Sequence, residues 1–204
     1  MAPPVGLIIG HSFIHGLSQH IDSHHAATPH QVAHSLKLYH IMEKIYLHGQ
    51  RGALACSPSY QLPHRILKQA KPDFVILELG TNDLAAGFSP FQVANRLEAI
   101  GCQLKSHYHV TSVTFCAILN RQAQLHNLTP DQFATAAYET NNYLRHYAAG
   151  TPNYRYHKHP GFWTPHISTW SRDGIHPNTT AGRRKYITSI RQAAFHALES
   201  FTSS

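Results

Sequence analysis

Short apolar runs alternate with longer amphipathic stretches along the chain of 204 residues. Runs of strand length, rich in aliphatic, aromatic or β-branched residues, predict β-strands at five places. They are VGLII at 5–9, KIYLHG at 44–49, DFVILELG at 73–80, VTSVTFCAIL at 110–119 and YRYHKH at 154–159. The run at 73–80 is almost continuously apolar, which is typical of a strand covered on both faces.

Stretches with apolar residues at helical spacing separate these runs. They predict helices over 12–40, with a break near Thr28–Pro29, and over 58–70, 91–107, 130–148 and 179–201. In the helix over 130–148, Thr129 is the expected N-cap. The side chains expected to face the core there are Phe133, Ala137, Tyr138 and Leu144.

Alternating strands and helices favour right-handed crossovers, and therefore a parallel sheet with helices on both faces. We expect an α/β fold in which three layers, α/β/α, surround about five parallel strands. Residues 1–204 are expected to form one domain, either complete in itself or a segment of a longer protein. Ligand sites in such folds lie at the carboxyl ends of the strands.

The chain is basic, with 17 Lys and Arg against 10 Asp and Glu and a formal net charge of +7. This favours an anionic partner such as nucleic acid or acidic lipid, although solubilising surface charge is the preferred explanation because no long run of Lys and Arg exists. Nineteen histidines are scattered along the chain, and His30 and His34 have the spacing of a metal-binding pair on a helix. Since no Cys or carboxylate completes a ligand set nearby, we expect no metal and no cofactor.

The cysteines Cys56, Cys102 and Cys116 are odd in number and lack metal-type spacing. We expect them to be buried, unpaired hydrophobic residues in a reducing compartment. No apolar run is long enough to span a bilayer, and the first residues lack the features of a signal peptide. These observations favour an intracellular, cytoplasmic location.

Two polar elements at opposite ends of the chain suggest nucleophilic chemistry. Ser12 follows the strand at 5–9 and Gly10, while Asp173 and His176 stand three residues apart in DGIHPN. A serine becomes a nucleophile when a neighbouring base takes its proton and a third group orients that base. Taken singly, Ser12 is more simply a helix cap and the Asp–His step a polar turn.

Two further elements would complete such a site. Asn82 follows the buried strand in LELGTND, where its amide can face a developing oxyanion. Gly49 and Gly52 in HGQRGA allow a tight loop with an N–H directed into the cleft. Each element alone is an ordinary turn, but together they favour one site at the strand ends. Neither a phosphate loop nor G-x-G-x-x-G is present.

The segments IIGHSF, HGQRG, LGTND and DGIHP, in this order, resemble the four blocks of the SGNH hydrolases, the GDSL-type esterases and lipases. The resemblance spans nearly the whole chain and implies the flavodoxin-like SGNH hydrolase fold. It implies Ser12 as the nucleophile, Asp173 and His176 as its acid–base pair, and Ser12, Gly52 and Asn82 as the oxyanion hole. Gly49 is the less favoured glycine.

The sequence departs from the family at one position, because His11 stands where an acidic residue usually precedes the nucleophile. The α/β-hydrolase fold has the same Ser, Asp, His order. It requires, however, an elbow of the form G-x-S-x-G near the middle of the sequence, and that elbow is absent here.

The resemblance implies a serine esterase, and the absence of a lid-sized insertion favours short acyl esters, above all acetyl esters. Phe162, Trp163, Ile167 and Trp170 lie in the loop before Asp173. The two tryptophans either bind substrate or anchor this loop to the domain. The alternative function is a non-catalytic or weakly catalytic module that binds nucleic acid or anionic lipid through its basic surface.

Overall fold

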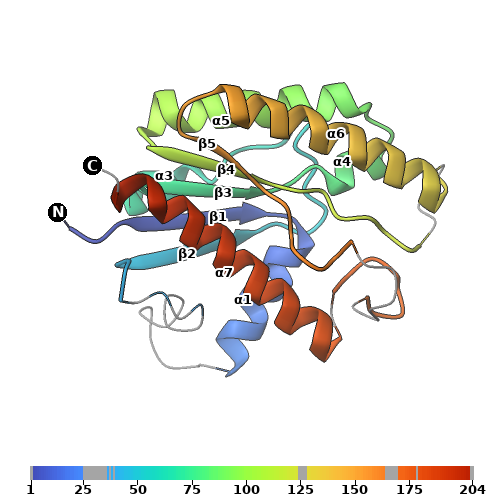
Figure 1. The fold of residues 1–204 in the computed structure, drawn as a ribbon, viewed down its shortest axis with the longest axis horizontal. Helices are drawn as coiled ribbons and strands as arrows, with labels where there is room; N and C mark the ends of the chain where they lie inside the picture. Colours follow the sequence, from blue (N-terminus) through green and yellow to red (C-terminus); the bar gives the residue numbers. More distant parts are fainter. Residues whose placement is uncertain are drawn as a thin grey trace.

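The computed structural model describes residues 2–24, 36, 38, 40–123, 128–163, 170–177 and 179–202. A five-stranded sheet in the order β2-β1-β3-β4-β5 runs through its centre (Figure 1). The strands are β1 (Val5–Gly10), β2 (Lys44–Gly49), β3 (Phe74–Glu78), β4 (Ser112–Cys116) and β5 (Tyr154–His157). All neighbouring strands are parallel, which confirms the predicted α/β class.

The strand order changes direction at β1, which lies between β2 and β3. Connections from the two neighbouring strands β1 and β3 therefore diverge at their carboxyl ends, and such a point leaves a crevice for a ligand. Gly10 at the end of β1 is in register with Glu78 at the end of β3 and with Gly49 at the end of β2. The segments that follow these three strands consequently start at the same edge of the sheet.

Helices cover both faces of the sheet and make the fold three-layered (Figure 1). One face packs against α1 (Ser12–His24) and α7 (Thr180–Thr202). The other packs against α3 (His64–Ala70), α4 (Thr81–Ala85), α5 (Pro90–Tyr108) and α6 (Pro130–Gly150).

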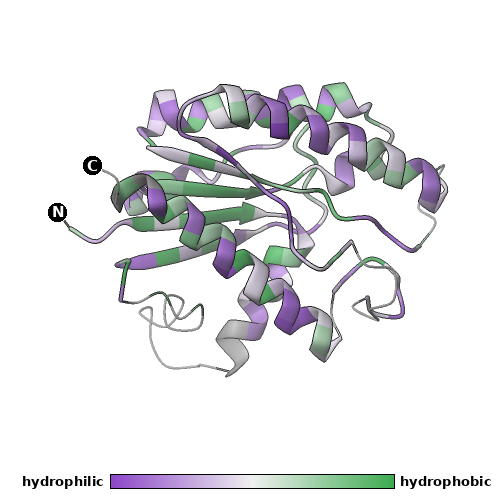
Figure 2. Ribbon diagram, viewed as in Figure 1, coloured by the Kyte–Doolittle hydropathy of each residue, from purple (hydrophilic) through white to green (hydrophobic). Residues whose placement is uncertain are grey.

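Each central strand contributes to both cores because successive side chains point to opposite faces. In β1, Leu7 and Ile9 pack towards α5 and α6, whereas Ile8 packs towards α1 and α7. Figure 2 shows that hydrophobic residues are concentrated on the strands.

The two longest helices of the α5–α6 layer begin with matching caps. Thr129 accepts a hydrogen bond from the Gln132 N–H, and the Gln132 side chain accepts one from the Thr129 N–H. Ser89 and Gln92 form the same capping box at α5. The predicted N-cap at Thr129 is confirmed, and each box satisfies two helix-end donors.

Several local predictions were wrong. The helix expected over 58–70 begins only at His64, after Pro63. Tyr138 is 66% exposed rather than inward-facing, because it follows the buried Ala137 by one residue and therefore lies about 100° further round the helix. Cys102 is exposed on α5 and Cys56 is half-buried, so only Cys116 fits the expectation of burial, although all three cysteines are free.

The helix predicted over 12–40 is described as α1 only to His24, and the described residues 36, 38 and 40 are not helical, so the prediction was wrong at that end. The pair His30 and His34 lies outside the described residues. Within the described part of the chain, no helix combines the length and the apolar character needed to cross a membrane.

Candidate functional site

Ser12, His176 and Asp173 form a continuous series of hydrogen bonds at the carboxyl edge of the sheet. Ser12 is the first residue of α1, and its Oγ lies 2.9 Å from Nε2 of His176. Nδ1 of the same imidazole lies 2.7 Å from Oδ2 of Asp173. The fold thus brings together residues that are 164 positions apart in the sequence.

The loop around Asp173 orients its carboxylate towards the imidazole. Oδ1 accepts hydrogen bonds from the Ser171 hydroxyl at 2.6 Å and from the N–H groups of Ile175 and His176 at 2.8 and 2.9 Å. Partial burial tends to raise the pKa of Asp173, but these hydrogen bonds outweigh it and lower the pKa well below its ordinary value. An ionised Asp173 accepts the Nδ1–H of His176, which leaves Nε2 free to accept the Ser12 proton.

A second contact joins the turn that carries Ser12 to the turn that carries Asn82. His11 Nε2 lies 3.1 Å from Oγ1 of Thr81, and both side chains are buried. These residues immediately precede Ser12 and Asn82, so the bond holds the two predicted site residues at the same sheet edge.

His11 also supports the turn that carries Ser12, where the family usually has an acid. Its Nδ1 accepts the N–H of Phe13 at 3.4 Å, in the first turn of α1. Burial lowers the pKa of His11 to about 4, although Glu78 acts in the opposite direction. The neutral Nδ1 therefore caps the start of α1, a role that an Asp or Asn side-chain oxygen commonly has. The other ring nitrogen then carries the proton and donates to Thr81.

The carboxamide of Asn82 is held from both ends. Its Nδ2 donates to the Ala53 carbonyl at 3.1 Å, and its Oδ1 accepts from Nη2 of Arg121 at 3.0 Å. Because a guanidinium only donates and a carbonyl only accepts, these partners define the orientation of the amide. An amide held in this orientation has a second Nδ2–H that is able to donate to a ligand oxygen.

Sequence reasoning missed Arg121, which is only 6% exposed. Burial lowers its pKa to about 10, and Asp173 partly offsets this effect, so the side chain is a cation at neutral pH. The available signal was a charged residue two positions after the apolar run at 110–119. Its partner Asn82 is 39 positions away, and no spacing rule links the two.

The two candidate glycines serve different purposes. A Cβ on Gly49 would lie 2.0 Å from the backbone nitrogen of His15, so Gly49 permits the close approach of α1 to β2. Gly52 has a φ of +67° and open space around it, in the turn closed by the Ala53 N–H and the Gln50 carbonyl. Gly52 immediately precedes the residue whose carbonyl contacts Asn82.

The predicted substrate-binding tryptophans both pack against the core beneath α7. The Trp170 ring centroid is 6.5 Å from that of Phe13, which in turn lies 5.5 Å from the His176 ring. Trp163 lies beside Lys158, whose Nζ is 5.9 Å from the ring centroid. Both tryptophans therefore make anchoring contacts. Of the two, Trp170 contacts the ring of Phe13, which itself contacts the His176 ring. Ile167 lies outside the described residues.

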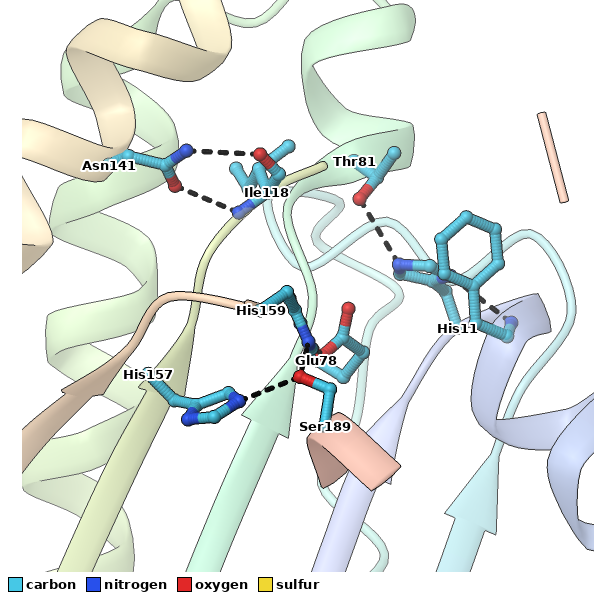
Figure 3. Close-up of polar contacts among 9 residues, drawn as sticks. His11, Glu78, Thr81, Ile118, Asn141, His157, His159 and Ser189 are labelled. Atoms are coloured by element: carbon cyan, nitrogen blue, oxygen red, sulfur yellow. Dashed lines mark hydrogen bonds and ion pairs between the residues drawn. The ribbon is translucent and has the colours of Figure 1, made fainter. Parts of the chain in front are cut away.

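A second Ser–His–carboxylate series lies in the interior (Figure 3). Glu78 Oε2 is 2.9 Å from His159 Nε2, and His159 Nδ1 is 2.8 Å from Ser189 Oγ. These three residues are at most 3% exposed, whereas the side chains of His176 and Asp173 are 28% and 44% exposed. Exposure, not the bonding pattern, makes the series at Ser12 the one that an ester can reach.

Among the described residues, Glu78, His159 and Cys116 bring three possible metal-ligand atoms within 4.8 Å of one another. Ligand atoms at a tetrahedral zinc are about 3.4 Å apart. Glu78 and His159 instead make a direct 2.9 Å hydrogen bond, and burial tends to raise the Glu78 pKa while His159 outweighs it and lowers it. The group is accounted for as an internal hydrogen-bond network.

Comparison with known proteins identifies the family of the chain. The sequence pattern of the GDSL-like Lipase/Acylhydrolase family matches residues 8–184, and the chain belongs to this family. The predicted membership of the SGNH, or GDSL-type, hydrolases is therefore confirmed. No curated protein matches the sequence.

Solved structures share the fold at low sequence identity. An acetyl esterase solved with an acetate ion has a TM-score of 0.65 and 12% identity, covering 98% of this chain and 100% of its own. A carbohydrate acetylesterase family member from Sinorhizobium meliloti has a TM-score of 0.65 and 12% identity, with coverages of 96% and 99%. AlinE4, an SGNH-hydrolase family esterase, has a TM-score of 0.56 and 19% identity, with coverages of 97% and 98%.

Proposed function

We propose that this protein is a serine esterase that hydrolyses short-chain acyl esters, above all acetyl esters. The observation that carries the proposal is the accessible series of hydrogen bonds from Ser12 through His176 to Asp173. Membership of an acylhydrolase family supports ester hydrolysis in general. The acetyl preference is supported by two structural neighbours whose names describe acetyl esterases.

In the proposed mechanism, Ser12 Oγ attacks the ester carbonyl carbon while His176 Nε2 takes its proton. Asp173 keeps Nδ1 protonated and stabilises the imidazolium. The alcohol oxygen leaves with the proton from Nε2, and an acyl-serine remains. Water then attacks the acyl carbon, again giving a proton to His176, which returns it to Ser12 as the carboxylic acid forms.

The negative charge on the carbonyl oxygen requires donors that are already in place. We assign this role to Asn82 Nδ2 and to the backbone N–H groups of Ser12 and Gly52. Ser12 begins α1, so the N–H groups of the first helical turn also favour negative charge there.

Active-site labelling tests the assignment of the nucleophile. A fluorophosphonate should modify Ser12, as located by peptide mass spectrometry, and p-nitrophenyl acetate should be hydrolysed faster than longer-chain esters. Ser12→Ala should abolish both reactions. Ser106→Ala, in which an exposed serine of α5 is changed, is the matched control and should retain them. Undiminished turnover by Ser12→Ala would refute the mechanism.

A further inference from the structure

Three arginines lie in or beside the segments that form the proposed site. Arg51 immediately precedes Gly52, and Arg172 immediately precedes Asp173. Arg121 donates to the Asn82 side chain. Three positive charges therefore accompany the oxyanion glycine, the oxyanion amide and the catalytic acid.

Backbone hydrogen bonds hold these loops against the site. The Gln50 N–H donates to the carbonyl of Gly10, two residues before Ser12, at 2.9 Å. The Gln122 N–H donates to the carbonyl of Gly174 at 2.9 Å, so the segment with Arg121 is joined to the loop of Asp173. The Ser171 N–H donates to the carbonyl of His176 at 2.8 Å and closes that loop around Arg172.

The acids near these loops are already engaged by the protein. Asp173 receives the hydrogen bonds described above, and Asp83 is fully buried and accepts the N–H of Cys56 at 2.6 Å. Glu78 is buried against His159. The acids at this edge that lie nearest the site are therefore committed to internal contacts.

The arginines, in contrast, are not held in direct ion pairs with described residues, although Asp173 acts electrostatically on the buried Arg121. Among the described residues, none of Arg51, Arg121 and Arg172 forms an ion pair. Arg51 and Arg172 are exposed, and the contact of Arg51 is with the uncharged Gln19 side chain at 3.5 Å. Buried Arg121 has an Nε donor without a hydrogen-bond partner in the described part of the chain. Like charges gathered around a site favour the approach of a group of opposite charge.

We propose that the preferred substrate is an acyl ester whose alcohol part carries a negative charge, such as a carboxylate, sulfate or phosphate, near the scissile bond. The inference rests on the proposed esterase function. The charge is assigned to the alcohol because His176 returns its proton to the leaving oxygen, and Arg172 belongs to the same closed loop as His176. A preference that arose from the net charge of the whole surface would not depend on these particular arginines.

Three acetate esters with the same ring test this proposal: meta-acetoxybenzoate, its neutral methyl ester and meta-acetoxyphenyl-trimethylammonium. Each kcat/KM is divided by the rate constant of the same ester with hydroxide, which removes the difference in leaving-group reactivity. At low ionic strength the anionic ester should exceed the neutral one by about tenfold, and the cationic ester should be the slowest. In about 1 M salt, where the Debye length is about 3 Å, the preference should largely disappear.

Variants that each remove one positive charge show which arginines produce the preference for the anionic ester. Arg51→Gln and Arg172→Gln should each lower the ratio of anionic to neutral ester rates by roughly two- to threefold. Lys68→Gln removes one charge from an exposed position in the last turn of α3 and is the matched control, for which the ratio should stay unchanged.

The outcomes separate this inference from the proposed function. Hydrolysis of all three esters at equal normalised rates would overturn the charge preference and leave the esterase assignment intact. A preference that Lys68→Gln reduces as much as Arg172→Gln would also overturn it, because the overall charge would then be its source. Absence of both turnover and fluorophosphonate labelling would refute the esterase function, and the inference with it.

Discussion

Lowering the pH from 7 to 5 is expected to destabilise the folded protein, because two histidines are buried in the neutral form. Burial lowers the pKa of both His11 and His157 to about 4. For His157, the neighbouring His159 lowers the pKa further and Glu78 partly opposes it. The unfolded chain takes up protons at these positions near the ordinary value of 6.5, whereas the folded protein does so only near pH 4. The stability they provide is therefore complete above pH 6.5 and is lost as the pH falls towards 4.

The size of the effect follows from proton linkage. Each pH unit between the two pKa values contributes about 1.4 kcal/mol per histidine. A fall to pH 5 therefore costs about 2 kcal/mol for each, or about 4 kcal/mol together. This is a large part of the roughly 5–15 kcal/mol that stabilises a typical domain. The lowered pKa values of Asp173 and Glu78 affect stability only below the ordinary pKa range of carboxyl groups, which lies outside the interval from pH 7 to pH 5.

Urea unfolding is followed by far-ultraviolet circular dichroism at pH 7, 6 and 5 and constant ionic strength. It measures the slope of the free energy of unfolding against pH. His157→Gln can keep a hydrogen bond to Ser189, which now lies 2.8 Å from His157 Nε2, and should remove about half of the pH dependence that His11 and His157 supply together. His146→Gln changes an exposed histidine of α6 and is the control with an unchanged slope. A free energy of unfolding that is constant from pH 7 to 5, or a full slope in His157→Gln, would refute the reasoning.

Three further predictions concern the site. Asn82→Ala should lower kcat by about 10²–10³, measured with p-nitrophenyl acetate, if its amide holds the oxyanion. Arg121→Met should lower kcat in the wild-type protein but should have little further effect in the Asn82→Ala variant, because Arg121 acts through the Asn82 amide. Additive losses in this double-mutant cycle would contradict the assignment. His11→Ala should reduce the free energy of unfolding by about 1 kcal/mol through loss of the helix cap, whereas His11→Asn should retain most of it; equal losses in a urea titration would count against the capping role.

The layout of the sheet was largely predictable because local pattern carries it. Apolar runs of strand length separated by amphipathic stretches are sufficient to predict parallel strands with helices on both faces. Details that depend on helix phase or on packing were not predictable. Tyr138 differs from the buried Ala137 only by one step around α6, and the exposure of Cys102 depends on where α5 meets its neighbours.

The sequence by itself also identified the candidates Ser12, Asn82, Asp173 and His176, since each stands in a short motif at a strand end or before a helix. Tertiary structure decided how they are supported. The contacts of His11 with Thr81 and of Arg121 with Asn82 join segments 70 and 39 positions apart. Motif spacing does not encode such contacts, because they depend on which strand ends meet at the sheet edge.

Only tertiary structure distinguishes the two Ser–His–carboxylate series. Ser12–His176–Asp173 and Ser189–His159–Glu78 use the same chemical groups in the same order of hydrogen bonds. The first lies where loops leave the sheet, and the second lies beneath α7 with almost no exposed surface. Residue type determines what a side chain could do, but access to substrate depends on burial, which arises only when distant segments pack together.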